Sequence, residues 1–266
     1  MITPAHSTVM EAPAIKCAFV LHGLNANPKR MEDLAALAKL NGYEPTIGVL
    51  SGHHNSNQAK NEKKITAENW KSEFQTQWNS STTNCRGQND QRLFIAYSLG
   101  ALLGVTVFDG PMQIQLPTKM ILIAPALTFQ AKTMLLRALS FLPFGGIPSA
   151  NHPEYRVHGW TSFAEYDALF KLNKEWKKTA WSKTANVKTL LALEPKDELV
   201  DSDELAKQIQ DEKIQQWTIE WITNQSSTLR PKYHHLIIDE KSQGTEQWKA
   251  FSDKIGKFLS QEETLR

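Results

Sequence analysis

The chain has 266 residues, 41% of them hydrophobic, and its 30 basic side chains nearly balance 28 acidic ones, giving a formal net charge of +2. So small a net charge creates no strong field, and we expect no nucleic-acid partner. No apolar run is long enough to cross a bilayer, so we expect no integral membrane segment. The length suits one domain with room for an insertion and leaves the oligomeric state open.

The two cysteines and the first residues of the chain bear on its location. Cys17 lies in a predicted buried strand and Cys85 in a polar loop, and we expect both to be free thiols. The segment before residue 15 has no basic start followed by an apolar stretch, which is the pattern of a secretion signal. Both observations favour a cytoplasmic protein, although a chain from which a signal had been removed would look the same.

Predicted strands and helices alternate along the chain. Apolar strands are expected at 15–21, 45–50, 92–97, 119–125, 188–193 and 216–222, and helices at 28–41, 67–79, 99–109, 202–213 and 245–259. This alternation predicts an α/β fold with a mostly parallel sheet of about six strands flanked by helices. Right-handed crossovers bring the carboxyl ends of such strands to one edge, where open α/β sheets bind ligands.

One interval breaks this alternation. Between the fourth and fifth predicted strands lie about sixty residues, which is too many for a simple connection in a compact α/β unit. The interval is rich in Leu, Phe and Trp, and several of its aromatic residues approach helical spacing. We therefore expect a core made of residues 1–127 and 187–266, with residues 128–186 inserted as a helical cap.

The third predicted strand runs into a helix of small residues, with one hydroxyl group, that of Ser98, at the junction. A sharp turn between strand and helix strains the serine backbone, so the residues two before and two after it must be small. Ala96 and Gly100 meet this demand, with Ala96 replacing the first glycine of the G-x-S-x-G pattern. The motif predicts a nucleophile elbow, and the alternative is a serine that only caps the helix.

Two later strands are followed by an acid and by a pair of histidines. Asp197 follows the strand at 188–193, and Asp201 four residues later is better placed to cap the next helix. His234 and His235 precede the C-terminal helix. A serine, an acid and a histidine therefore follow one another along the chain, each at the predicted end of a strand.

This order, together with a first strand that ends in His22-Gly23, resembles the serine hydrolases of the α/β-hydrolase fold. Bacterial carboxylesterases and monoacylglycerol lipases are the members it resembles most, and the resemblance covers nearly the whole chain. It implies that Ser98 is the nucleophile and that Asp197 is the acid of a catalytic triad.

The resemblance also implies an oxyanion hole and a base. In this family the residue after the His-Gly pair and the residue after the nucleophile donate backbone N–H groups, which here implies Leu24 and Leu99. The family's base is followed by a short apolar run and then by an acidic residue at a set distance. Aligned without gaps on Asp239, this pattern selects His234 as the base and leaves His235 as the alternative.

Other histidines receive structural roles. We expect the ring of His22 to pack or hydrogen-bond within its own loop. Residues 49–54 resemble the family's Leu-x-Gly-His loop, which we read as a structural turn. A metal site built from His53 and His54 is disfavoured, because adjacent side chains on an extended loop diverge and no Cys or carboxylate cluster accompanies them. The resemblance implies no metal and no organic cofactor.

The implied activity is the hydrolysis of carboxylic esters, either short- to medium-chain acyl esters or monoacylglycerol-like lipids, through an acyl-enzyme. A cap lined with Leu, Phe and Trp makes the pocket apolar, so the expected partner is a small apolar ester. Two alternatives remain open, since one fold hosts many functions. The same triad can serve a thioesterase or an amidase, and the fold can serve a binding protein without activity.

Overall fold

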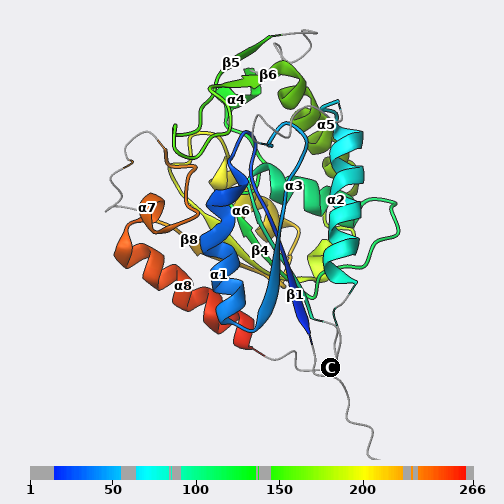
Figure 1. Ribbon diagram of the computed structural model, residues 1–266, viewed down its shortest axis with the longest axis vertical. Coiled ribbons are helices and arrows are strands. Elements are labelled where there is room, and N and C mark those ends of the chain that lie inside the picture. The colour runs from blue at the N-terminus through cyan, green and yellow to red at the C-terminus, as the bar shows by residue number, and fades with distance from the viewer. Residues whose placement is uncertain are drawn as a thin grey trace, which may run out of the picture.

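The structure is a computed structural model that describes residues 15–54, 64–83, 85, 91–135, 137, 145–223, 229 and 233–261. Its centre is a parallel sheet of six strands in the order β2-β1-β3-β4-β7-β8 (Figure 1). The strands are β1 (Lys16–Leu21), β2 (Tyr43–Gly48), β3 (Arg92–Tyr97), β4 (Lys119–Ile123), β7 (Lys188–Leu193) and β8 (Trp217–Trp221). The predicted class and the six-stranded sheet are confirmed.

Helices cover both faces of the sheet. On one face lie α1 (Glu32–Leu40), preceded by the 3-10 turn η1 (Pro28–Met31), and α8 (Thr245–Ser260) beside it (Figure 1). The other face carries α2 (Ala67–Thr82), α3 (Leu99–Asp109), α5 (Phe163–Thr179) and α6 (Ser202–Asp211). The short helices α4 (Ala131–Leu135), α7 (Glu240–Gln243) and η4 (Thr184–Asn186) complete the described set.

Alternation of side chains along the central strands divides the apolar core into two layers, since successive residues of a strand point to opposite faces. Phe19 and Phe94 point toward α2 and α3, where both rings meet Trp78 at centroid distances of 6.1 and 6.0 Å. Val20 and Ile95, one residue further along each strand, pack on the opposite side under α1 and α8. This two-sided burial explains the nearly continuous apolar runs in the strands.

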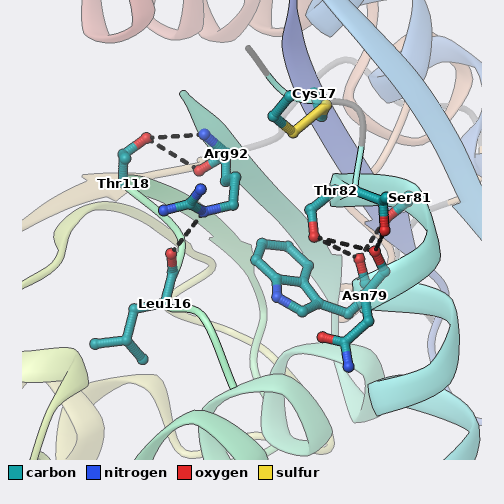
Figure 2. The surroundings of a disulfide bond; sticks show 10 residues. Cys17, Asn79, Ser81, Thr82, Arg92, Leu116 and Thr118 are labelled. Carbon is teal, nitrogen blue, oxygen red and sulfur yellow. Dashed lines mark hydrogen bonds between the residues drawn. A yellow bond between two sulfur atoms is a disulfide. The ribbon is translucent and has the colours of Figure 1, made fainter. Parts of the chain in front are cut away.

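Helix α2 runs three residues beyond the predicted end at residue 79. The hydroxyls of Ser81 and Thr82 donate to the carbonyl of Trp78, at 2.9 and 2.8 Å, and so are satisfied within the helix (Figure 2).

The insertion between β4 and β7 contains α4, a short antiparallel pair made of β5 (Gly146–Pro148) and β6 (Trp160–Ser162), and α5. A capping box starts α5, because Ser162 and Glu165 satisfy each other's backbone N–H groups. Leu172 and Trp176 of α5 belong to the same buried cluster as α2 and α3. The insertion therefore shares the core of the sheet, and the division at residues 128 and 186 stays a prediction.

The expectation of free thiols was wrong, because Cys17 and Cys85 form a disulfide (Figure 2). Cys17 is the second residue of β1, and Cys85 follows the end of α2, where its N–H donates to the carbonyl of Thr82. Composition did not show that α2 returns the chain to the start of β1. The expectation of a cytoplasmic location thereby loses one of its two supports. Within the described ranges, no helix combines the length and the apolar character that a bilayer span requires.

Candidate active site

Ser98 occupies the sharp turn between β3 and α3. Its backbone lies at φ 51° and ψ −112°, a conformation that L-residues rarely adopt. The Ser98 N–H donates to the carbonyl of Ile123 at 2.9 Å, and its carbonyl accepts from the N–H groups of Leu102 and Ala126. Its side chain makes no capping bond to α3. The structure therefore shows the predicted strained turn and contradicts the helix-capping alternative.

Close packing explains why glycines flank this turn. A Cβ on Gly100 would lie 2.6 Å from the carbonyl oxygen of His22, so α3 could not approach the end of β1. A Cβ on Gly23 would lie 2.8 Å from the ring of Tyr97 and 3.1 Å from the Cβ of Ser98. Both glycines thus allow the loop after β1 to lie directly against Ser98.

A continuous chain of hydrogen bonds runs from Ser98 to Asp197. The hydroxyl oxygen of Ser98 lies 2.8 Å from Nε2 of His235, and Nδ1 of the same ring lies 2.7 Å from Oδ2 of Asp197. The second carboxylate oxygen of Asp197 accepts from the N–H groups of Leu199 and Val200, each at 2.8 Å. The buried carboxylate is therefore fixed on both oxygens, and it orients the imidazole toward the serine.

His234, selected from the sequence as the base, does not face Ser98. Its Nδ1 lies 3.6 Å from Oε1 of Glu194, on the loop that follows β7. The alignment was anchored on Asp239, which caps α7 and accepts a hydrogen bond from the Tyr155 hydroxyl. Because adjacent side chains diverge, an error of one residue in the assumed spacing chose the wrong histidine of the pair. The choice of His234 is corrected to His235.

The environment of His235 sets its proton affinity. Burial by itself lowers the pKa of the imidazole. The charge of Asp197, its hydrogen bond to Nδ1 and the charge of Glu198 outweigh burial, so the pKa lies above the ordinary value of 6.5. With Nδ1–H donating to Asp197, Nε2 of the neutral ring is the nitrogen that can accept the serine proton.

Leu24 and Leu99 are the oxyanion donors that the resemblance implies, and that role stays a prediction. Leu99 is the first residue of α3, and Leu24 follows Gly23 and lines the same cavity as Ser98. In the part of the chain that the structure describes, neither backbone N–H donates to a protein acceptor. Unpaired N–H groups of this kind, one of them at a helix N-terminus, favour a negative charge nearby.

The other residues singled out from the sequence lie in structural positions away from the hydrogen-bonded chain of Ser98, His235 and Asp197. Asp201 caps α6 by accepting from the N–H of Glu204 at 3.0 Å, as expected. His53 is buried and accepts from the backbone N–H of Asn25, while the neighbouring His54 is partly exposed. Among the described residues, no three His, Cys, Asp or Glu side chains converge to form a possible metal site.

A cavity of about 100 Å³ lies beside Ser98. None of the described residues that line it is Asp, Glu, Lys or Arg. Most of the lining is apolar, and the insertion contributes several short polar side chains. The lining residues are Leu24, Tyr97, Ser98, Ala126, Phe129, Thr133, Ile147, Ser149, Ala150, Asn151, Thr161, Tyr166, Leu169, Leu199, Val200 and His235.

Sequence reasoning missed two groups that contact this site. Glu198 accepts a hydrogen bond of 3.0 Å from the backbone N–H of His235, in addition to its electrostatic effect on the ring. Asn151 donates from Nδ2 to the carbonyl of Leu24 at 2.7 Å. The position of Glu198 next to Asp197 was a usable signal, whereas Asn151 lies 127 residues from its partner and had none.

No protein-family model matches the sequence, and no curated protein matches it significantly. Solved structures do match. A soluble variant of monoglyceride lipase from Saccharomyces cerevisiae, in complex with a substrate analogue, has a TM-score of 0.71 and 13% identity, over 95% of this chain and 89% of that chain. The monoacylglycerol lipase of Paleococcus ferrophilus gives a TM-score of 0.63 and 16% identity, over 92% of this chain and 98% of that one.

A metagenome-derived lipolytic enzyme is similar to the same extent, with a TM-score of 0.64 and 18% identity over 91% of this chain and 96% of that chain. At these identities the likeness is one of fold. It confirms the predicted class, and the chain has the α/β-hydrolase fold.

Proposed function

We propose that the protein is a serine hydrolase that cleaves carboxylic esters through an acyl-enzyme. The observation that carries this proposal is the chain of two hydrogen bonds, 2.8 and 2.7 Å, that joins Ser98 to His235 and His235 to Asp197. A hydroxyl linked in this way to an oriented imidazole and a buried carboxylate is an activated nucleophile. The proteins of similar fold include two monoacylglycerol lipases, and ester hydrolysis by such lipases agrees with this chemistry.

In the acylation step, His235 accepts the hydroxyl proton while the Ser98 oxygen attacks the ester carbonyl carbon. The carbonyl oxygen becomes an oxyanion, which the N–H groups of Leu24 and Leu99 stabilise, and Asp197 stabilises the imidazolium. The intermediate collapses as His235 returns the proton to the leaving alcohol. The same ring then deprotonates a water molecule, which attacks the acyl-enzyme carbonyl. As the bond from the acyl carbon to the Ser98 oxygen breaks and the acid leaves, His235 returns the proton to that oxygen.

The cavity supports a neutral, apolar acyl group. Its described lining contains no Asp, Glu, Lys or Arg side chain, so a charged acyl group would lose its hydration without gaining a partner. Its volume of about 100 Å³ is smaller than the roughly 150 Å³ of an engineered cavity that binds benzene. We therefore place the preferred acyl chain at the short end of the short- to medium-chain range.

Hydrolysis of p-nitrophenyl esters of increasing acyl length tests this proposal. We expect turnover by the purified protein, highest with short chains, and a loss of about a millionfold in kcat in the Ser98→Ala variant. A thioester of the same acyl group, added as a competitor, separates esterase from thioesterase preference. Absence of turnover with every ester, or equal turnover by the Ser98→Ala variant, would refute the proposal.

A further inference from the structure

We propose that His22 and His53 are positioning residues, which aim the Leu24 N–H at the reacting oxygen by fixing the two peptide groups on either side of Leu24. The inference rests on the proposed function, because only a reaction that forms an oxyanion needs this N–H. Neither ring touches Ser98 or the acid, so the two histidines act through the backbone of the loop after β1.

The first of these peptide groups joins Gly23 to Leu24. Its carbonyl oxygen accepts from Nδ1 of His22 at 2.9 Å and from the N–H of Ala26 at 3.2 Å. The peptide bond is planar and trans, so its C=O and N–H point in opposite directions. A donor that fixes the carbonyl of Gly23 therefore also fixes the direction of the Leu24 N–H. The same donor polarises this peptide and strengthens its N–H as a donor.

The second peptide group joins Leu24 to Asn25. Its N–H donates to Nε2 of His53 at 2.8 Å, and its carbonyl accepts from Nδ2 of Asn151 at 2.7 Å. Of the four polar groups in the two peptides, three thus have protein partners. The Leu24 N–H is the fourth, and it makes no hydrogen bond to any described residue. Every polar group of these two peptides is hydrogen-bonded except the one that would meet the substrate.

The hydrogen bonds of the two rings define their tautomers. Nε2 of His22 accepts from the N–H of Leu50 at 3.2 Å, which leaves the proton on Nδ1 facing Gly23. His53 follows the same rule, with Nε2 accepting from Asn25 and Nδ1 facing the carbonyl of Ser51 at 3.2 Å. Both rings therefore bridge from the loop after β1 to the loop after β2.

Burial keeps both rings neutral. The two side chains are inaccessible to solvent, and their ring centroids are 4.4 Å apart. Burial lowers the pKa of His22 to about 4 and the pKa of His53 well below its usual range. Each ring then offers one donor and one acceptor at neutral pH, which is what these bonds require.

The side chain of Asn25 ties the same loop to the insertion. Asn25 has a φ of 50°, in the left-handed region, and its side chain bonds to the backbone of His158 through both its amide nitrogen and its oxygen. The amide nitrogen also lies 3.2 Å from the hydroxyl of Thr161. The insertion thus supports the loop from outside while the two histidines hold it from within.

Paired substitutions separate positioning from packing. The amide nitrogen of an Asn side chain reaches about as far as Nδ1 of His, and the amide group of Gln about as far as Nε2. His22→Asn can therefore keep the bond to Gly23, whereas His22→Gln loses it. For His53 the essential atom is Nε2, so His53→Gln can keep the bond to Asn25 and His53→Asn loses it.

We expect opposite preferences at the two positions. Relative to wild type, kcat for a short p-nitrophenyl ester should fall by about 10- to 100-fold in His22→Gln and His53→Asn, with KM nearly unchanged, because a displaced donor acts mainly on the transition state. The partner variants, His22→Asn and His53→Gln, should stay within about threefold of wild type. The inhibition constant of an alkyl boronic acid, whose adduct with Ser98 is a tetrahedral anion, should rise in parallel with the fall in kcat.

Melting temperatures provide the control for folding. If each pair of variants loses kcat equally, or if the losses follow the melting temperatures alone, the rings only pack and the inference is overturned. Variants that do not fold are replaced by Asn151→Ala, which removes the bond to the Leu24 carbonyl and should lower kcat by a smaller factor. An unchanged kcat there counts against the inference. A wild-type protein without ester turnover sinks the proposed function itself, whereas wild-type turnover with unselective variants sinks this inference alone.

Discussion

Removing the disulfide between Cys17 and Cys85 should destabilise the protein without slowing its chemistry. The two cysteines are 68 residues apart in sequence, so the bond restricts a long loop of the unfolded chain. Loop-closure entropy for a loop of this length corresponds to about 4 kcal/mol at 25 °C. For a chain of this size, that loss lowers the melting temperature by roughly 10 °C.

The location of the bond predicts that activity survives. Cys17 lies near the start of β1, whereas the loop that contacts Ser98 follows the other end of the same strand. The bond also fastens the end of α2 next to Arg92, whose side chain donates to the carbonyl of Leu116 (Figure 2). Guanidinium unfolding of the oxidised protein, the reduced protein and a Cys17→Ala, Cys85→Ala double variant measures the difference in unfolding free energy.

Three results would refute this reasoning. The denatured, unreduced protein should contain no reactive thiol, so two titratable thiols would contradict the bond itself. A change in unfolding free energy below about 1 kcal/mol, with the bond verified by mass spectrometry, would contradict the loop-entropy estimate. A reductant that lowers kcat of the folded wild type, but not that of the double variant, would contradict the separation of the disulfide from the active site.

Three further predictions concern the histidines and their surroundings. His235→Gln should lower kcat by about a millionfold and His234→Gln by less than tenfold; the reverse order would restore His234 as the base. Glu198→Gln removes a charge that favours the imidazolium, so the pKa of His235 falls and the acid limb of kcat/KM moves to lower pH; an unmoved limb contradicts this. The pKa of His22 is about 4 in the folded protein and about 6.5 in the unfolded chain, so the unfolded state binds the proton first as pH falls. Protonation of His22 should therefore lower the free energy of unfolding by about 3 kcal/mol between pH 6.5 and pH 4. Denaturant titrations of wild type and His22→Asn at both pH values measure this difference, and equal losses of stability would contradict it.

The sheet and the strained turn at Ser98 were predictable because they depend on local patterns. Each central strand is buried on both faces, so its residues form an apolar run that can be recognised directly in the sequence. The turn at Ser98 demands small neighbours, which leaves a signature within five residues. The position of Asp197 beside the imidazole was predictable in the same way, since Asp197 follows a recognisable strand.

The choice of base and the disulfide were not predictable from such patterns. His234 and His235 are adjacent residues of the same type, so the sequence does not distinguish them. Which ring faces Ser98 depends on the path of the turn that the hydrogen bond from the Leu236 N–H to the Tyr233 carbonyl closes. The disulfide depends on where α2 ends in space. No spacing rule encodes that position, and composition argued for free thiols.

Between β4 and β7, the sequence predicted the long helix but not the two short strands. Its aromatic residues showed the helical spacing of α5, whose buried face packs on α3. The pair β5 and β6 has only three residues in each strand, too few for alternation to appear in the sequence. The contacts of Asn25 and Asn151 join segments more than a hundred residues apart, so only the fold reveals them.

Covalent capture by a fluorophosphonate reports on the activation of Ser98, because only a serine deprotonated by a neighbouring base reacts quickly with such a probe. We expect stoichiometric labelling of Ser98, identified by peptide mass spectrometry, at a rate that falls sharply in His235→Gln and is retained in His234→Gln. Labelling of a different residue, or an equal rate in the His235→Gln variant, would contradict it.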